Sequence, residues 1–302
     1  MEMPTIRHLE CLVAVADTLS FRRAAARCHI SQPALSAQIK QLETLLGLSL
    51  FERDKRRVLT TKAGEVVAEK ARLILADLRE LSDVSRLFQA PLSGVFRMGV
   101  IPTIAPYFLP RAVNAIHDAF PQAQLTLRED QTHRLLASLE RGDLDVLLLA
   151  LEVELGGMKT MAIMEDPFWL TVPCGHRLAG RKRVRLKDLN GEQILLLEDG
   201  HCLRDQALEI CRLAEASELH DFRASSPTTL VQMVAGGMGV TLVPEIALEY
   251  ECSPERQLSA VPFGGEKPKR TIGLVYRPSS LRHHEFEVLA ELLREKVRLN
   301  GD

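Results

Sequence analysis

The chain has 302 residues, of which 46% are hydrophobic and 26% charged, which excludes fibrous and disordered classes and leaves room for two or three globular domains. No apolar run approaches the roughly 18 residues of a membrane helix, and the N-terminus does not resemble a secretory signal. We therefore expect a cytoplasmic protein that makes no membrane contact. The six cysteines form no CxxC pair and no metal-ligand spacing, which predicts free thiols, no metal and no cofactor.

Charge is distributed unevenly along the chain. The net charge is −2, yet residues 1–62 carry ten Lys or Arg against six Asp or Glu, a balance of +4, and the remaining 240 residues carry −6. A basic head on an acidic body is typical of a protein whose one end meets phosphates.

The head predicts three helices. Thr5 to Ala16 places apolar residues on one helical face, and Ser20 caps a short helix from Phe21 to Cys28. After a tight turn, Ser31 caps a third helix that ends at Gly47. This order is typical of a helix-turn-helix.

A hairpin and a long helix follow. Leu48 to Thr61 contains the polar turn Arg53-Asp54-Lys55-Arg56-Arg57 and predicts a wing that lies along the DNA backbone. From Ala63 to Phe88 apolar residues keep helical spacing for about seven turns, which indicates a coiled-coil-like dimer seam. Ala90 to Gly94 then predicts a hinge. The expected domains are a DNA-binding head at 1–62, a linker and dimerisation helix at 63–90 and a regulatory body at 91–302.

The body alternates short buried strands with amphipathic helices. We expect strands at Val95 to Ile101, Gln124 to Arg128, Val146 to Leu151, Ile194 to Leu197, Val240 to Val243 and Thr271 to Tyr276, and helices at Ile104 to Ala119, Thr132 to Arg141 and Thr228 to Gly236. The alternation predicts parallel sheets with helices on both faces. Thr103, Thr132 and Cys202 each follow a strand, and ligands of such sheets bind at that end, so the three are expected to converge on one cleft.

Cys202 and Cys211 lie nine positions apart in a segment that predicts a helix from Leu203 to Leu213. A helix rises about 1.5 Å per residue, which places the two sulfurs roughly 13.5 Å apart on opposite faces. A disulfide needs Cα atoms within about 7 Å, so linking the pair requires the helix to unwind. Such a bond would act as a switch, and the alternative is two ordinary buried cysteines on an amphipathic helix.

The expected position of Cys202, in the first turn of this helix beside His201 and Arg204, favours a reactive thiol. Exposed N–H groups and the helix dipole favour an anion there, so the thiol should ionise more easily than a free cysteine. The thiolate is the form that attacks peroxide.

Motifs along the chain resemble those of the LysR-type transcriptional regulators. In the head they are Ser20 to Ala25, Ser31 to Ser36, Ile39 to Glu43, Leu46 to Arg53 and Leu59 to Gly64. In the body they are Ile101 to Thr103, Gln131 to His133, Leu195 to Gln206, Cys211 and Arg270 to Pro278, and here the chain is most similar to members that sense hydrogen peroxide. The resemblance implies an α/β fold with an N-terminal winged helix-turn-helix, a long linker helix and a C-terminal periplasmic-binding-protein-like regulatory domain of two α/β subdomains.

The resemblance also implies the site residues of the body. Cys202 would be the peroxidatic cysteine and Cys211 its resolving partner in a reversible disulfide. The residues that would hold peroxide are Thr103, Thr132, His201, Asp205 and Arg270. Threonine hydroxyls donate and accept hydrogen bonds, and a fixed guanidinium stabilises developing negative charge. Otherwise Thr103 and Thr132 would be helix N-caps, Arg270 a surface charge, and Asp205 a residue that stabilises its own helix.

The candidate DNA-binding residues of the head divide into two kinds. On or near the recognition helix lie Ser31, Gln32, Pro33, Ser36, Gln38 and Lys40, of which Gln bonds adenine edges and Ser reaches bases or phosphates. Phosphate contacts are expected from Arg22, Arg53, Lys55 and Arg56, although a solvated charged turn is the alternative for the wing.

The resemblance implies a regulator, not an enzyme, that binds double-stranded promoter DNA and responds to hydrogen peroxide. It further implies a homotetramer built as a dimer of dimers, activation of antioxidant genes through RNA polymerase, and reduction by a glutaredoxin-type partner. Two alternatives stay open. A LysR-type regulator that binds a small metabolite in its cleft gives no reason for the cysteine pair, and a thiol peroxidase fused to a DNA-binding head needs a fast recycling partner.

Overall fold

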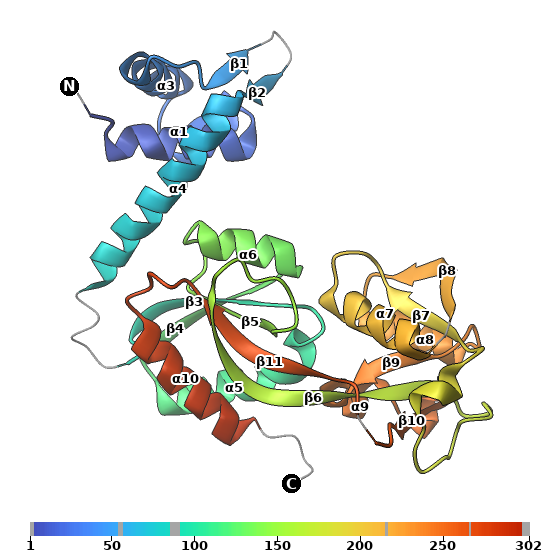
Figure 1. The fold of residues 1–302 in the computed structure, drawn as a ribbon. Helices are drawn as coiled ribbons and strands as arrows, with labels where there is room; N and C mark the ends of the chain where they lie inside the picture. Colours follow the sequence, from blue (N-terminus) through green and yellow to red (C-terminus); the bar gives the residue numbers. More distant parts are fainter. Residues whose placement is uncertain (1–2, 54–56, 85–90, 215–216, 266, 298–302) are drawn as a thin grey trace. The chain divides into compact units, whose positions relative to one another are not determined.

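The computed structural model describes residues 3–53, 57–84, 91–214, 217–265 and 267–297 (Figure 1). The chain divides into two compact units, residues 1–85 with 140–143 and residues 86–139 with 144–302. Among the described residues, no helix is both long and apolar enough to cross a membrane.

Helices and a small hairpin build the N-terminal unit. Its elements are α1 (Ile6–Thr18), α2 (Phe21–Arg27), α3 (Gln32–Leu46), β1 (Phe51–Arg53), β2 (Val58–Thr60) and α4 (Lys62–Asp83). The side chains of Ser20 and Ser31 accept hydrogen bonds from backbone N–H groups in the first turns of α2 and α3, as the sequence predicts. α4 is followed in the chain by residues 85–90, so the expected end of this helix at Phe88 lies outside the described residues.

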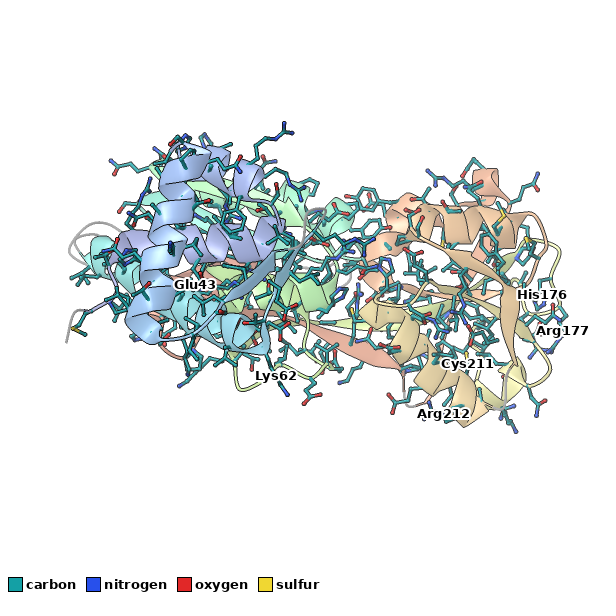
Figure 2. The ribbon with its side chains drawn as sticks, turned by 90° about the horizontal axis from the view of Figure 1, so that it is seen from above. Glu43, Lys62, His176, Arg177, Cys211 and Arg212 are labelled. Carbon is teal, nitrogen blue, oxygen red and sulfur yellow. The ribbon has the colours of Figure 1, made fainter. Side chains whose placement is uncertain are left out.

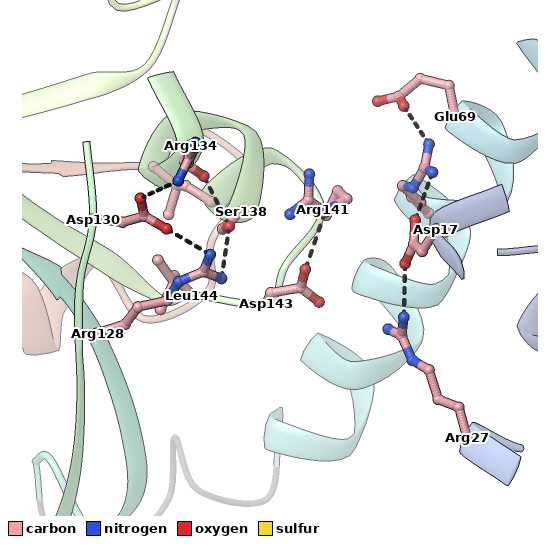
Figure 3. Close-up of polar contacts among 12 residues, drawn as sticks. Asp17, Arg27, Glu69, Arg128, Asp130, Arg134, Ser138, Arg141, Asp143 and Leu144 are labelled. Atoms are coloured by element: carbon pink, nitrogen blue, oxygen red, sulfur yellow. Dashed lines mark hydrogen bonds and ion pairs between the residues drawn. The ribbon is translucent and has the colours of Figure 1, made fainter. Parts of the chain in front are cut away.

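Ion pairs connect three of these helices. Asp17 of α1 binds Arg27 of α2 at 2.9 Å and Arg72 of α4 at 2.8 Å, and Arg72 also binds Glu69 at 3.0 Å (Figure 3). The Arg72 side chain is 17% exposed, so its pair with Asp17 is better shielded from solvent than the pair of Arg27. The first half of the long helix α4 is thereby fixed to the helix-turn-helix.

The wing is attached through backbone contacts. Glu43 of α3 accepts hydrogen bonds from the backbone N–H groups of Leu50 and Phe51 at 2.8 and 3.3 Å. Gly64 in the first turn of α4 is packed so closely that a Cβ there would lie 2.0 Å from the carbonyl oxygen of Leu50. Any larger residue at this position would push α4 away from the wing.

The described residues of the C-terminal unit form a seven-stranded sheet and a two-stranded sheet covered by helices (Figure 1). The strands are β3 (Gly94–Val100), β4 (Ala123–Glu129), β5 (Val146–Ala150), β6 (Lys159–Pro173), β7 (Gln193–Leu197), β8 (Ser217–Ala224), β9 (Thr241–Pro244), β10 (Leu258–Pro262) and β11 (Lys269–Tyr276). The helices are α5 (Ala105–Ala119), α6 (Thr132–Glu140), α7 (Cys202–Ala214), α8 (Pro227–Ala235), α9 (Glu245–Glu251) and α10 (His283–Lys296). The large sheet has the order β10-β6-β11-β5-β3-β4, and β9 also pairs with β6.

The long strand β6 divides this unit into two α/β subdomains. Its first half pairs with β11 and its second half with β9 and β10. One subdomain contains β3 to β5 with α5, α6 and α10, and the other contains β7 to β10 with α7 to α9 (Figure 1). A winged helix-turn-helix, a long helix and a two-subdomain α/β body confirm the predicted fold class.

The prediction of parallel sheets is correct for some strand pairs and wrong for the others. β3 pairs in parallel with β4 and β5, and β7 with β8, but β11 is antiparallel to β5 and β6, and β6 is antiparallel to β9 and β10. The chain leaves the first subdomain along β6 and returns to it along β11, which requires opposite directions. The sequence did not reveal β6, because polar and apolar residues are mixed along its first half and leave no continuous apolar run.

Candidate functional site

Cys202 and Cys211 both lie in α7, which begins at Cys202 itself. Both side chains are buried, and all six cysteines of the chain are free thiols. Cys211 faces the interior while its neighbour Arg212 is exposed (Figure 2). The two cysteines lie nine positions apart on a continuous helix, which corresponds to a rise of roughly 13.5 Å, so the thiols of this conformation are out of bonding range.

Arg270 occupies the centre of the site. Its side chain is completely buried on β11, where the guanidinium donates from Nε to Asp166 Oδ2 at 2.9 Å. The other two nitrogens donate to Thr103, Nη1 to the hydroxyl and Nη2 to the carbonyl oxygen, each at 3.0 Å. The interpretation of Arg270 as a surface charge is therefore wrong, because its strand lies in the interior of the sheet between β5 and β6.

The two threonines do not act as N-caps. Thr103 follows β3 and is buried, but the N-cap of α5 is Ile104, which makes no side-chain capping bond. Thr132 is the first residue of α6. Its Oγ1 is buried and makes no regular hydrogen bond within the described part of the chain, although it lies close enough to Cys202 to favour the thiolate. Both hydroxyls are thus available to a small polar ligand.

The thiol of Cys202 is more weakly acidic than expected. Burial raises the pKa of Cys202, opposed by the positive charge of Arg270, the hydroxyl of Thr132 and the N–H of Leu203, while Asp205 raises it further. The prediction of an easily ionised thiol is wrong for this conformation, because the loss of hydration outweighs the groups that favour the anion. In this conformation Cys202 is a neutral thiol, and Arg270, Thr132 and the N–H of Leu203 are placed to stabilise its thiolate.

The remaining predicted residues lie around this centre. His201 is buried immediately before α7, and burial lowers its pKa despite Glu198, whose Oε1 lies 3.9 Å from Nε2, so the imidazole is neutral. Asp205 is exposed on the first turn of α7. Cys211 has separate surroundings, where burial and then the charge of Glu218 raise its pKa to about 11.

Asp166 is a member of the site that sequence reasoning missed. It lies directly opposite Arg270 in the register of β6 and β11 and is itself fully buried. It was missed because β6 was not predicted, and a lone aspartate in an unassigned segment carries no signal. The available signal was weak, because Asp166 and Arg270 pair only if β6 and β11 are already known to be neighbouring strands.

The candidate DNA-binding face lies on α2, α3 and the wing. Exposed there are Arg22, Ser31, Gln32, Pro33 and Lys40, while Ser36 and Gln38 are half-buried. Ser31 is committed to capping α3. Arg53 belongs to β1, and Lys55 and Arg56 lie outside the described residues.

Comparison with known families agrees with this architecture. Residues 6–65 match the bacterial regulatory helix-turn-helix protein, lysR family, and residues 89–298 match the LysR substrate binding domain. The chain belongs to the LysR family. This LysR-type protein is therefore a DNA-binding transcriptional regulator.

Individual LysR-type relatives match nearly the whole chain. The DNA-binding transcriptional dual regulator OxyR of Escherichia coli K12 is 44% identical and covers 97% of this chain and 95% of its own. The hydrogen peroxide-inducible genes activator of Dickeya chrysanthemi is also 44% identical, with coverage of 98% and 96%. The solved structure of full-length OxyR C199D from Pseudomonas aeruginosa has a TM-score of 0.78 at 32% identity and covers 97% of this chain and 98% of that one.

Proposed function

We propose that this LysR-type regulator senses hydrogen peroxide through a reversible Cys202–Cys211 disulfide and activates antioxidant genes. The observation that carries the proposal is the surroundings of Cys202, a buried thiol at a helix start, near a buried guanidinium and two threonine hydroxyls. The names of the similar chains, hydrogen peroxide-inducible genes activators, support the same function.

The first step oxidises Cys202. The sulfur attacks the proximal oxygen of peroxide, the O–O bond breaks, and the distal oxygen leaves with the thiol proton as water, so the products are a sulfenic acid and one water. Arg270 stabilises the negative charge on the leaving oxygen. Because the Thr103 oxygen already accepts from Arg270, its hydroxyl hydrogen is directed elsewhere and is available to the peroxide. The buried hydroxyl of Thr132 supplies a second contact.

The second step forms the disulfide. The Cys211 sulfur attacks the sulfenic sulfur of Cys202, and a second water leaves with the Cys211 proton and the sulfenic hydroxyl. The helix that holds the two residues roughly 13.5 Å apart must unwind first. Unwinding removes Leu203, Ala207 and Ile210 from the core. A glutaredoxin-type partner that donates two electrons and two protons would restore both thiols.

Assembly and location complete the proposal. We propose a cytoplasmic homotetramer, a dimer of dimers that acts on RNA polymerase at promoter sites. The exposed apolar residues of α4, namely Val66, Leu73, Ile74 and Leu81, support its use as a dimer seam. The domain boundaries of 1–62, 63–90 and 91–302 and the DNA contacts of the head belong to the same proposal.

The experiment that tests the disulfide is a non-reducing peptide map of protein treated with a small excess of hydrogen peroxide. The expected result is one new disulfide between the Cys202 and Cys211 peptides. Pairing through Cys174 or Cys252, with Cys202 and Cys211 still reduced, would contradict the proposal. Oxidation that stops at one peroxide per chain marks a sensor, whereas sustained peroxide consumption coupled to NADPH oxidation would mark a peroxidase.

A further inference from the structure

The buried pair of Asp166 and Arg270 has a role beyond folding. We infer that Asp166 is a positioning residue of the peroxide site, one that neutralises Arg270 and aims its guanidinium at Thr103. The inference rests on the proposed function, because it assigns to Asp166 the geometry with which the site meets peroxide.

The contacts of Asp166 define one orientation of Arg270. Oδ2 accepts from Nε of Arg270 at 2.9 Å, and both side chains are fully buried. Oδ1 accepts from the backbone N–H of Ile246 at 3.1 Å, and the N–H of Glu245 adds a further hydrogen bond. The carboxylate is therefore fixed to the start of α9. Since a guanidinium is planar, fixing Nε restricts the directions open to its two terminal nitrogens, and both of them bind Thr103.

Charge balance gives Asp166 a second effect, on Cys202. The groups that act on this thiol come from three elements: Arg270 of β11, Thr132 of α6, and the N–H of Leu203 with Asp205 of α7, while neutral His201 precedes it. Of these, only Arg270 carries positive charge. Burial raises the pKa of Asp166, but Arg270 and the N–H groups of Ile246 and Glu245 favour its ionised form, which compensates the charge of Arg270. In the resting protein the buried charges thus cancel without a thiolate, and Cys202, whose pKa is raised by burial, stays protonated. Without the carboxylate, Arg270 would need another anion, and the Cys202 thiolate is the group whose charge it already stabilises.

The test compares Asp166→Asn with Asp166→Glu. The Asn variant removes the charge and keeps the size, whereas the Glu variant keeps the charge and displaces the carboxylate by one methylene group. A matched control is Glu165→Gln, because Glu165 is the adjacent residue of β6 and forms an exposed ion pair with Lys269. Two quantities are measured on the Cys202 peptide by mass spectrometry: the pH midpoint of alkylation by neutral iodoacetamide and the rate constant for hydrogen peroxide.

For Asp166→Asn we expect the alkylation midpoint to move to lower pH and the peroxide rate constant, compared at equal thiolate fraction, to fall at least about tenfold. For Asp166→Glu we expect a midpoint close to that of the wild type together with a similar fall in rate. Glu165→Gln should change neither quantity. If Asp166 had a merely structural role, the two variants would not differ in this way. Loss of packing alone does not move the alkylation midpoint of Cys202 toward lower pH.

Other outcomes of the same measurements would contradict the inference. A wild-type midpoint and rate in Asp166→Asn would overturn the inference, and so would a wild-type rate in Asp166→Glu. If Asp166→Asn does not fold, as judged by circular dichroism, Asp166→Glu decides through the rate alone. A wild-type protein in which Cys202 is inert to peroxide would refute the proposed function, while the alkylation profiles would still report whether Asp166 controls the charge of the site.

Discussion

Arg204 and Glu218 form an ion pair that holds α7 against β8, with Nη2 of Arg204 2.9 Å from Oε1 of Glu218. Both side chains are largely buried, and Nε of Arg204 lies 3.1 Å from Asp199. Arg204 lies between the two cysteines in sequence, so we expect the unwinding that a Cys202–Cys211 disulfide requires to disturb these contacts. The ion pair stabilises the helical state, in which both cysteines are thiols. It should therefore shift the equilibrium between thiols and disulfide toward the thiols.

Weakening this ion pair should favour the disulfide. In Arg204→Gln the helical state loses a charge-assisted bond of about 1.5 to 3 kcal/mol, whereas the unwound state loses little. Since 30 mV corresponds to about 1.4 kcal/mol for two electrons, the reduction potential should become more negative by roughly 30 to 60 mV. Equilibration with glutathione buffers measures it, with Arg212→Gln as the control on an exposed position of α7 (Figure 2). A potential that rises, or one that shifts equally in the control, would contradict this role.

The two cysteines should be separable by mutation. Cys202→Ser should abolish peroxide-induced transcription, because it removes the sulfur that we propose to attack peroxide. It should leave DNA binding intact, because Cys202 lies in the C-terminal unit. Cys211→Ser should still form a sulfenic acid at Cys202, detectable with dimedone, but no intramolecular disulfide. Full peroxide-induced transcription from Cys202→Ser would exclude the assignment of this residue.

The sequence predicted the local features of the site and missed its long-range pairing. Ser20, Ser31 and the start of α7 were predictable because a cap or a helix depends on residues within one or two turns. The burial of Arg270 was not, since it depends on Asp166, which lies 104 residues earlier in an unrecognised strand. The acidity of Cys202 was misjudged for a similar reason: its position at a helix start is local, but its burial is a property of the assembled fold.

Stability in alkali should depend on Cys211. Burial and then Glu218 raise its pKa from 9.0 to about 11, so the folded state holds the thiol proton more tightly than the unfolded state. The stability from this thiol is therefore complete below about pH 9 and is lost as the pH rises toward about 11. Urea unfolding of reduced protein at pH 8 to 10.5 should show a smaller decline in Cys211→Ala than in the wild type. Identical declines would mean that the thiol has a similar pKa in both states.

Two exposed residues of the head should contribute to DNA binding by different routes. Arg22→Ala removes a guanidinium that we propose to contact phosphate, which should weaken binding on every sequence and reduce the salt slope by about one. Gln32→Ala removes an amide that we propose to contact a base edge, which should cost about 1 to 3 kcal/mol on the specific site and little on random DNA. Titrations against salt on operator and random duplexes separate the two effects. If both variants behave alike, the division into phosphate and base contacts is wrong.

The last prediction concerns the refolding of α7. Because the helix separates Cys202 from Cys211 by roughly 13.5 Å, oxidation must break its backbone hydrogen bonds and release Leu203 and Ile210 from the core. Amides from residues 203 to 211 should therefore lose protection from hydrogen exchange in the oxidised protein and regain it after reduction. The two states must differ by only a few kcal/mol, or the disulfide would not be reversible at cellular potentials. Cys211→Ser treated with the same peroxide is the control, since it is oxidised at Cys202 but cannot close the ring and should keep its protection. Unchanged exchange in this segment, with a disulfide confirmed by mass spectrometry, would show that the bond forms without loss of the helix and that the proposed mechanism is mistaken.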